Sequence, residues 1–323
     1  MSFITLENLT KEYTRFNKEE GLKGSIKSLF KREYICKRAV CDFSLEITEG
    51  EFVGLIGPNG AGKTTLMKML TGIISPTSGR ISVLGYVPNE LKNAYKKQFA
   101  IVMGQKSQLF QDLSAADTFL LLKEIYDIPE EEYRKNLNYL TELFSVKDYL
   151  NVQVRTLSLG ERMKMELIAA LLHDPKILFL DEPTIGLDAV AQKQIREFLK
   201  EVNRDRKTTI LLTSHYMEDI KSLCKRCVVI NHGQKIYDGA LDVLLSQYQT
   251  HKKITVSFEE ATEFLPGSEI QITEQNPFRL SFLAKRGDVN GILQQIMHSC
   301  TIEDISIEEE EIGNVIERIY QAQ

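Results

Sequence analysis

The segment from Glu51 to Thr71 constrains the fold of this 323-residue chain more than any other. It passes from an apolar stretch, FVGLI, through the glycine-rich loop GPNGAGKT at Gly57 to Thr64, into a pattern of helical spacing. Glycines allow backbone N–H groups to converge on an anion, and the helix that follows adds positive potential at its N-terminus. A strand, such a loop and a helix in this order predict a phosphate site on an α/β sheet.

The residues of this loop have separate expected tasks. The loop comprises Gly57, Pro58, Asn59, Gly60, Ala61, Gly62, Lys63 and Thr64. The Lys63 ammonium is expected to reach the β- and γ-phosphates of a nucleotide, the Thr64 hydroxyl to bind Mg²⁺, and Thr65 to add a phosphate contact. A chance glycine-rich loop is the alternative, and the strand before it and the helix after it argue against that interpretation.

A second segment, Leu157 to Asp188, reads LSLGERMKMELIAALLHDPKILFLDEPTIGLD. Within it an apolar run ends in two adjacent carboxylates, Asp181 and Glu182. A carboxylate at this strand end can hold Mg²⁺, as Asp181 is expected to do, and Glu182 can polarise an attacking water as a general base. A solvated acidic turn is the alternative, but it does not explain why the pair ends a buried strand and precedes Pro183.

Together the two segments resemble the ATPase subunit of an ABC transporter, and the resemblance covers roughly residues 3 to 240. It implies an enzyme that binds ATP with Mg²⁺, hydrolyses it to ADP and phosphate, and builds each ATP site from two chains. The long stretch between Ser158 and Asp188 and the short acidic tail resemble the ATPases of ABC-2 type exporters, which implies a role in export.

The resemblance also assigns tasks to four residues outside these motifs. Gln105 matches the Q-loop glutamine that senses Mg²⁺ and the γ-phosphate, and His215 matches the switch histidine that contacts the γ-phosphate. Asp188 matches the D-loop aspartate at the dimer interface, and Tyr13 the aromatic residue that stacks on adenine. Each has a structural alternative: a histidine after a strand is usually capped or solvated, and a tyrosine at a strand end usually packs at an edge.

The signature segment departs from the family's usual LSGGQ. In the family its serine hydroxyl and a glycine N–H bind the γ-phosphate held by the other chain; here Ser158 and Gly160 remain. Leu159 replaces the first glycine and Glu161 the glutamine. Donors at a helix N-terminus can still face an anion, and the Glu161 charge is tolerable if its carboxylate points outward, toward the basic residues that follow.

The resemblance implies two kinds of partner. One is a set of membrane subunits on separate chains, which the apolar stretch at 107–122 is expected to contact. The other is a second ATPase subunit, identical or related, that closes head to tail with this one over two ATP molecules. The expected location is peripheral, at the cytoplasmic face of the cell membrane. No run of about 18 apolar residues could span a bilayer, and a net charge of -5 gives no reason to expect nucleic-acid binding.

Two rival functions compete with this interpretation. A non-transport ABC ATPase of the DNA-repair type needs a long coiled coil between the phosphate loop and the signature, and one of the translation-factor type needs two sets of motifs; the sequence has neither pattern. A regulatory ATP-binding module with low turnover is the other rival. Leu159 and Glu161 keep it open, whereas Glu182 and His215 argue against it.

The order of patterns along the chain predicts the fold class. Short apolar runs at 52–56, 177–181 and 208–215 are typical of buried parallel strands, and a hairpin with its turn at His232 and Gly233 follows them. We expect an α/β fold, a P-loop NTPase sheet domain with an inserted helical subdomain, plus a small C-terminal α+β domain. The expected bounds are 1–245 for the ATPase domain, about 106–172 for the helical subdomain and 251–323 for the accessory domain.

Two regions differ in charge from the rest of the chain. Residues 15–38 carry eight basic and three acidic residues, and apolar residues such as Leu22, Ile26 and Phe30 recur there at helical spacing. A basic amphipathic helix can contact anionic lipid or a membrane subunit, or it can fold onto its own domain; both interpretations stay open. Residues 251–323 carry six basic and thirteen acidic residues and have no motif that we could interpret.

The five cysteines have no framework spacing. Cys224 and Cys227 form a CxxC, but a zinc site needs about four ligands, so helix-end packing is expected rather than metal or redox function.

Overall fold

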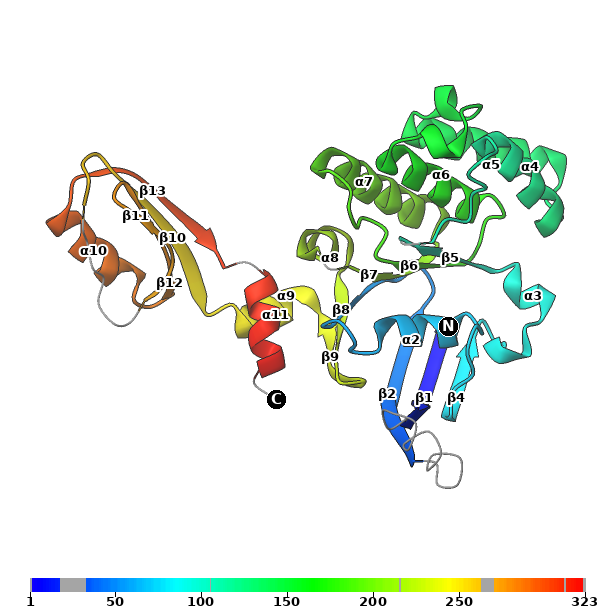
Figure 1. The fold of residues 1–323 in the computed structure, drawn as a ribbon, viewed down its shortest axis with the longest axis horizontal. Coiled ribbons are helices and arrows are strands. Elements are labelled where there is room, and N and C mark those ends of the chain that lie inside the picture. The colour runs from blue at the N-terminus through cyan, green and yellow to red at the C-terminus, as the bar shows by residue number, and fades with distance from the viewer. Residues whose placement is uncertain are drawn as a thin grey trace, which may run out of the picture. The chain divides into compact units, whose positions relative to one another are not determined.

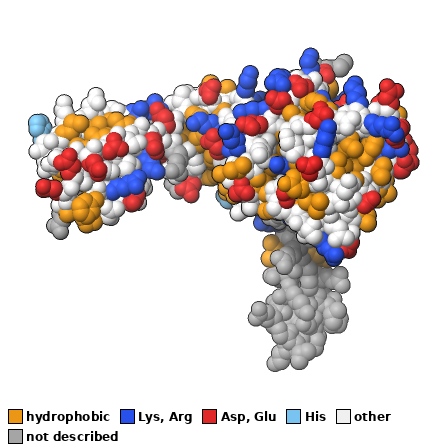
Figure 2. Space-filling model, turned by 90° about the horizontal axis from the view of Figure 1, so that it is seen from above, with side chains coloured by type: hydrophobic (Ala, Val, Ile, Leu, Met, Phe, Trp, Pro, Cys, Tyr) orange, Lys and Arg blue, Asp and Glu red, His pale blue; other side chains and the backbone are white. Residues whose placement is uncertain are grey.

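A computed structural model describes residues 2–17, 33–104, 106–214, 216–262, 270–310 and 312–321. The chain forms two compact units, Met1–Gly239 and Ala240–Gln323. Each has its own sheets and helices (Figure 1). None of the helices in the described ranges is long and apolar enough to cross a membrane. On the face shown in Figure 2, basic and acidic side chains are interspersed, and apolar side chains gather between them.

The larger unit is built on a six-stranded sheet with the order β5-β6-β7-β3-β8-β9. Its strands are β5 (Phe99–Met103), β6 (Ile177–Asp181), β7 (Thr209–Thr213), β3 (Phe52–Ile56), β8 (Arg226–Asn231) and β9 (Gln234–Ala240). All pairs from β5 to β8 are parallel. Every residue of β3 and β7 is buried, because a parallel sheet is covered on both faces and its central strands are therefore apolar throughout. The predicted sheet domain is confirmed.

A second sheet packs against the same core. It is antiparallel, with the order β2-β1-β4, from β1 (Ser2–Asn17), β2 (Glu33–Thr48) and β4 (Ser78–Val83). Helix α2 (Lys63–Leu70) lies between the two sheets in Figure 1. Leu66 and Leu70 of α2 join Ile4 of β1 and Phe179 of β6 in one buried cluster, so the helix after the phosphate loop is fixed from both sides.

The predicted helix at 15–38 is wrong at both of its ends. Residues 15–17 continue β1 and residues 33–38 begin β2, with Phe16 opposite Tyr34 and Thr14 opposite Cys36 in the ladder. Aromatic and β-branched residues flank the insert, and their preference for a hairpin ladder overrides the helical spacing there. Leu22, Ile26 and Phe30 lie outside the described residues.

A helical group follows the first strands of the larger unit. It contains α4 (Ala115–Tyr126), α5 (Glu130–Phe144) and α6 (Leu159–Leu171), which lie together above the sheet in Figure 1. Ser114 caps α4 in a capping box with Asp117. The Phe144 ring of α5 stacks on Phe198 of α7 (Ala189–Arg206), with ring centroids 3.6 Å apart, and so joins the group to the larger unit. The inserted helical subdomain of the predicted fold is confirmed.

Shorter elements complete this unit. They are α3 (Asn93–Lys96), α8 (Met217–Leu223) and the 3-10 helices Pro88–Glu90, Lys147–Tyr149 and Val154–Thr156. The predicted hairpin turn at His232 and Gly233 is present between β8 and β9, and both residues have positive φ, 46° and 80°. Cys224 and Cys227 are free and buried, and burial raises the pKa of the Cys227 thiol to about 12, which keeps that thiol protonated.

The smaller unit has an antiparallel sheet with the order β11-β12-β10-β13. Its elements are α9 (Leu241–Tyr248), β10 (His251–Phe258), β11 (Gln271–Asn276), β12 (Arg279–Lys285), α10 (Val289–Ser299), β13 (Ile302–Glu309) and α11 (Ile312–Gln321). Ile254, Phe282 and Ile296 belong to its own buried cluster. This matches the small α+β unit of the predicted fold, whereas its accessory role stays a prediction.

A buried histidine ties the helical group to the sheet and gives a test of stability against pH. His173 lies just after α6, stacks on Tyr126 of α4 with ring centroids 3.9 Å apart, and bonds the Phe99 carbonyl of β5 at 3.2 Å. Its Nδ1 has no hydrogen-bond partner among the described residues. Burial lowers the pKa of His173 to about 4, so the folded chain keeps the ring neutral.

We therefore expect acid to weaken the fold through His173. The unfolded chain takes up this proton below about pH 6.5, whereas the folded chain resists it. The contribution of the neutral His173 ring to the free energy of unfolding is therefore complete above that pH, and about 3 kcal/mol is lost as the pH drops through 4. Urea unfolding of the parent and of His173→Phe, which keeps the ring stack, measures this; the variant should lose less stability over that range. His298→Ala, at an exposed position, is the control, and equal pH slopes for the parent and His173→Phe would contradict the prediction.

Candidate nucleotide site

The glycine-rich loop follows β3 and is held by close backbone approaches. A Cβ at Gly57 would lie 2.6 Å from the Ile230 carbonyl oxygen, and one at Gly62 would lie 2.3 Å from that of Ala39. Gly62 also has φ +111°, a conformation that L side chains rarely adopt. These two positions require glycine, because β8 on one side and β2 on the other pack directly against the loop.

Lys63, the first residue of α2, is buried with its charge turned back toward the loop. Its Nζ donates to the carbonyl oxygens of Gly57 at 2.7 Å and of Pro58 at 3.1 Å. Burial lowers the pKa of Lys63, while the carboxylates of Glu182 and Asp181 act against that shift. The two hydrogen bonds of this ammonium go to neutral carbonyl oxygens, and a buried cation gains from contact with an anion, so this arrangement suits a phosphate group.

Asp181 joins the loop helix to the sheet. Its Oδ2 accepts a hydrogen bond from the Thr64 hydroxyl of α2 at 3.0 Å, and its Oδ1 accepts one from the Thr213 hydroxyl of β7 at 2.6 Å. The carboxylate thus lies at the carboxyl end of β6, beside the first turn of α2. A hydroxyl and a carboxylate in contact are hard oxygen ligands, the kind that Mg²⁺ prefers.

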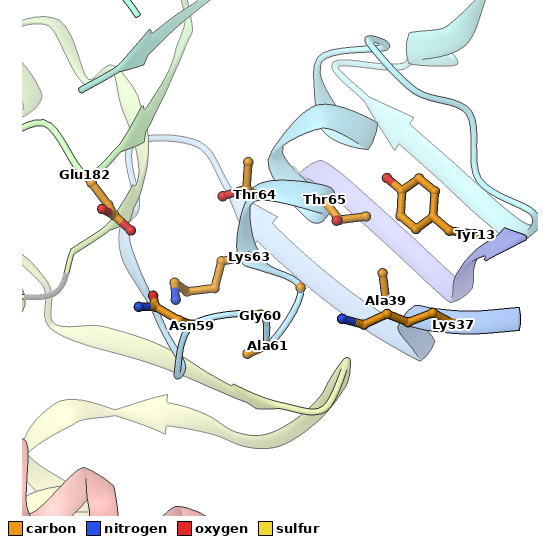
Figure 3. Close-up of a pocket in the computed structure, with 11 residues that line it drawn as sticks. Tyr13, Lys37, Ala39, Asn59, Gly60, Ala61, Lys63, Thr64, Thr65 and Glu182 are labelled. Carbon is orange, nitrogen blue, oxygen red and sulfur yellow. The ribbon is translucent and has the colours of Figure 1, made fainter. Parts of the chain in front are cut away.

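Glu182 leaves the strand direction immediately after Asp181. It has φ +57°, uncommon for a residue with a side chain, and its N–H donates to the Thr213 carbonyl at 3.0 Å. A Cβ at Gly104 would lie 2.2 Å from the Glu182 carbonyl oxygen, so the end of β5 packs against this turn. Strained backbone of this kind is common at functional sites, and here it turns the Glu182 side chain toward Lys63 (Figure 3).

Two adjoining pockets share Thr64 and Glu182. The first is lined by Tyr13, Lys37, Ala39, Asn59, Gly60, Ala61, Gly62, Lys63, Thr64, Thr65 and Glu182. The second is lined by Thr64, Lys68, Met103, Gly104, Lys106, Asp181 and Glu182. The structure therefore brings most of the predicted phosphate loop, both carboxylates and Tyr13 around one continuous site.

Tyr13 and Lys37 form the far wall of the first pocket. They are paired residues on β1 and β2, and Tyr13 is 41% exposed, with the Lys11 ammonium 5.3 Å from the centroid of its ring. An accessible ring face on the pocket wall suits stacking on a base. Lys37 was not predicted as a site residue. Its place opposite Tyr13 depends on strand register, which sequence spacing across an insert does not give.

The signature residues lie in a separate place, at the N-terminus of α6. Ser158 and Gly160 line neither pocket, and Ser158 is the N-cap of α6 in a capping box with Glu161. The Ser158 N–H and hydroxyl both bond the Glu161 carboxylate at 2.8 Å. The condition that this carboxylate points outward is not met, because the capping box holds it at the helix end, where the box satisfies the N–H groups of Ser158 and Glu161. The hydrogen bond from the Ser158 hydroxyl lowers the pKa of Glu161 most, and the hydrogen bond from the Ser158 N–H lowers it next.

Asp188 lies beside the signature. It is the N-cap of α7, where its side chain accepts from the Ala191 N–H at 2.9 Å. A Cβ at Gly160 would lie 3.0 Å from that of Ala191, so the two helix N-termini are in contact. The structure thus forms two groups, the pocket residues and the pair Ser158 and Asp188. The predicted residues Gln105 and His215 lie outside the described residues.

Comparison with known proteins agrees with this geometry. Residues 40–185 match the family model described as ABC transporter. The ABC transporter ATP-binding protein NatA of Bacillus subtilis (strain 168) is 36% identical over 207 residues, which cover 64% of this chain and 84% of NatA. The Nod factor export ATP-binding protein I of Burkholderia pseudomallei (strain 1710b) is 37% identical over 215 residues, 66% of this chain and 70% of that protein.

Among solved structures, a post-hydrolysis dimer of the ATP-binding cassette MJ0796 bound to ADP and Pi is similar in fold. The TM-score is 0.60 at 24% identity, over 74% of this chain and 98% of that one.

The contact between Gly104 and the Glu182 turn gives a test of the site. Gly104→Ala would force the Glu182 carbonyl to move, and overpacking of this kind costs about 1–3 kcal/mol of stability. We expect the urea midpoint to fall accordingly. Gly291→Ala in α10 is the matched control, since a Cβ there meets no atom within 4 Å, and it should leave the midpoint unchanged or raise it. Equal midpoints for the parent and Gly104→Ala would refute the packing argument.

Proposed function

The chain belongs to the family of ABC transporter ATP-binding proteins and is an ATP-hydrolysing transporter subunit, and from this premise we propose that it powers export through membrane subunits on separate chains. The observation that carries the proposal is the joining of the phosphate loop to Asp181 and Glu182 in one site, while Ser158 lies apart from that site at the N-terminus of α6. The export direction is supported by the similarity to a protein named for Nod factor export.

ATP would lie along the first pocket, with its base against Tyr13 and its phosphates in the loop. The Lys63 ammonium would exchange the carbonyls of Gly57 and Pro58 for oxygens of the β- and γ-phosphates. The N-terminus of α2 adds its positive potential at the same place, and Thr65 lines the pocket from the first turn of this helix. Lys37, on the pocket wall beside Tyr13, adds a cation that favours an anionic ligand.

Mg²⁺ fits the oxygen ligands at the start of α2. The Thr64 hydroxyl and the Asp181 carboxylate would hold it, with Gln105 as the further ligand implied by the family resemblance. When bound, the ion neutralises charge on the phosphate oxygens. The bond from Thr213 to the other oxygen of Asp181 orients that carboxylate, because it leaves Oδ2 directed at Thr64.

Hydrolysis would use Glu182 as the general base. Its carboxylate faces the loop from across the pocket, and it would take the proton of a water that attacks the γ-phosphate. Lys63 stabilises the negative charge that develops on the transferred group. His215 is proposed as the γ-phosphate contact by resemblance alone.

We propose that two chains complete each site. Ser158 and Gly160 line neither pocket, yet they lie at a helix N-terminus, where N–H groups suit an anion. Head-to-tail closure would bring this N-terminus of one chain to the γ-phosphate in the other, with Asp188 at the interface. Loss of the γ-phosphate would remove the shared anion and open the pair. The partner can be identical or a related ATPase.

The membrane subunits are proposed to contact exposed apolar side chains between β5 and the end of α4. These side chains are Phe110, Leu113, Leu120, Leu121 and Ile125. Phe110 is 52% exposed, unusual for a phenylalanine. Contact of this surface with membrane subunits would hold the chain peripherally at the cytoplasmic face of the membrane.

Glu182→Gln tests the hydrolytic role. Removing the general base should lower the turnover of ATP by about 10²- to 10⁴-fold, while the dissociation constant for ATP stays unchanged, because the phosphate loop is intact. Phosphate release and fluorescent-nucleotide binding measure the two quantities. Glu218→Gln, at an exposed carboxylate of α8, should leave both unchanged. An equally slow turnover in the parent and in Glu182→Gln would sink the enzymatic function.

Phe110→Asp tests the proposed membrane contact. A charge on this exposed surface should abolish transport or co-purification with membrane subunits, and it should leave basal ATPase activity intact because Phe110 lines neither pocket. The measurement compares ATPase rates of the isolated chain with co-purification from detergent-solubilised membranes. Val243→Asp, on the similarly exposed surface of α9, is the control. Equal loss of ATPase activity and co-purification would argue against the assignment.

A further inference from the structure

Asp219, near the start of α8, is fully buried and lines neither pocket. Its Oδ2 accepts hydrogen bonds from the Thr184 hydroxyl at 2.5 Å and the Ser214 hydroxyl at 2.7 Å. Its Oδ1 accepts one from the Arg196 guanidinium at 2.9 Å. Thr184 and Ser214 are buried as well. A buried carboxylate with three donors is fully satisfied, and such a network fixes the groups that it joins.

The three donors come from separate segments around the site. Thr184 follows the proposed base Glu182 by two residues, and Ser214 ends the stretch that precedes His215. The Tyr216 N–H donates to the Ser214 hydroxyl at 3.0 Å, so both neighbours of position 215 are connected to the network. Arg196 lies on α7, the helix that Asp188 caps.

The network begins where the sheet ladder ends. Asp181 opposite Thr213 is the last pair between β6 and β7, and the bond from the Glu182 N–H to the Thr213 carbonyl is the last backbone link between these segments among the residues that the structure describes. Beyond this bond the two segments of the chain leave the sheet in separate loops. Asp219 joins them again through their side chains.

We propose that Asp219 is a positioning residue for ATP hydrolysis. It holds the turn that carries Glu182 in a fixed place relative to the segment around residue 215 and to α7. The inference rests on the proposed function of Glu182. A base displaced by about 1 Å can lower the rate by about 10²-fold, so a link two residues from Glu182 has a kinetic effect that a remote buried ion pair does not have.

Paired variants of Thr184 test this without removing a buried charge. Thr184→Val removes the hydroxyl at nearly constant shape, and Thr184→Ser keeps it. We expect Thr184→Val to lower kcat by about 10-fold and Asp219→Asn by about 10- to 100-fold, with the dissociation constant for ATP unchanged in both. Thr184→Ser, which keeps the hydroxyl, should have a kcat within about twofold of the parent. The full chain is assayed with Mg-ATP, and Tm is recorded for each variant.

Arg206→Met is the matched control. Arg206 lies at the other end of α7, where its guanidinium bonds Asp174 at 2.9 Å. It anchors the same helix away from both loops, so its loss should lower Tm and leave kcat unchanged.

The outcomes separate the two levels of inference. A lowered Tm with kcat within twofold of the parent, in both Thr184→Val and Asp219→Asn, would show a purely structural network and overturn the proposal. If Asp219→Asn does not fold, the Thr184 pair decides. If the parent hydrolyses ATP no faster than Glu182→Gln, the proposed function itself fails. The parent and Glu182→Gln are therefore compared first, before the Thr184 and Asp219 variants are assayed.

Discussion

The Asp181 carboxylate accepts hydrogen bonds from Thr64 at the start of α2 and from Thr213 at the end of β7. These two contacts fix the phosphate loop against the carboxyl end of the parallel sheet, because α2 begins directly after the loop. The α2 side chains in turn lie in the core shared by both sheets of the larger unit. The site is therefore as rigid as the core, which is what positioning a phosphate against a base requires.

Local patterns made the phosphate loop and the sheet predictable. The loop lies between a strand and a helix, a Cβ at Gly57 or Gly62 would lie 2.6 Å or less from a neighbouring carbonyl oxygen, and the strands are short apolar runs. Each of these signals is contained in about ten residues, so one sequence was sufficient. The task of Glu182 followed from its place at the end of a buried strand, and the task of Ser158 from the family resemblance; their geometry is compatible with those tasks.

Features that depend on distant segments could not be predicted in the same way. Helical spacing in 15–38 suggested a helix, but residues at its two ends pair across the insert in one antiparallel ladder. The same ladder places Lys37 beside Tyr13. The three donors to Asp219 come from positions 184, 196 and 214, and no spacing in the sequence relates them. Burial and long-range pairing decide such contacts, and a single sequence contains little information on either.

The capping box at the signature shows what the departure from the family's usual glutamine means physically. A helix N-terminus offers free N–H groups, and in this chain a carboxylate of the same helix already bonds Ser158 through both its N–H and its hydroxyl. These bonds lower the pKa of Glu161, which keeps its charge at neutral pH. A phosphate that approaches Ser158 therefore meets an anion where a glutamine would present a neutral amide. In the proposed closure over ATP, one anion would replace another at this helix end, so the strength of the proposed dimer would depend on how readily Glu161 leaves Ser158.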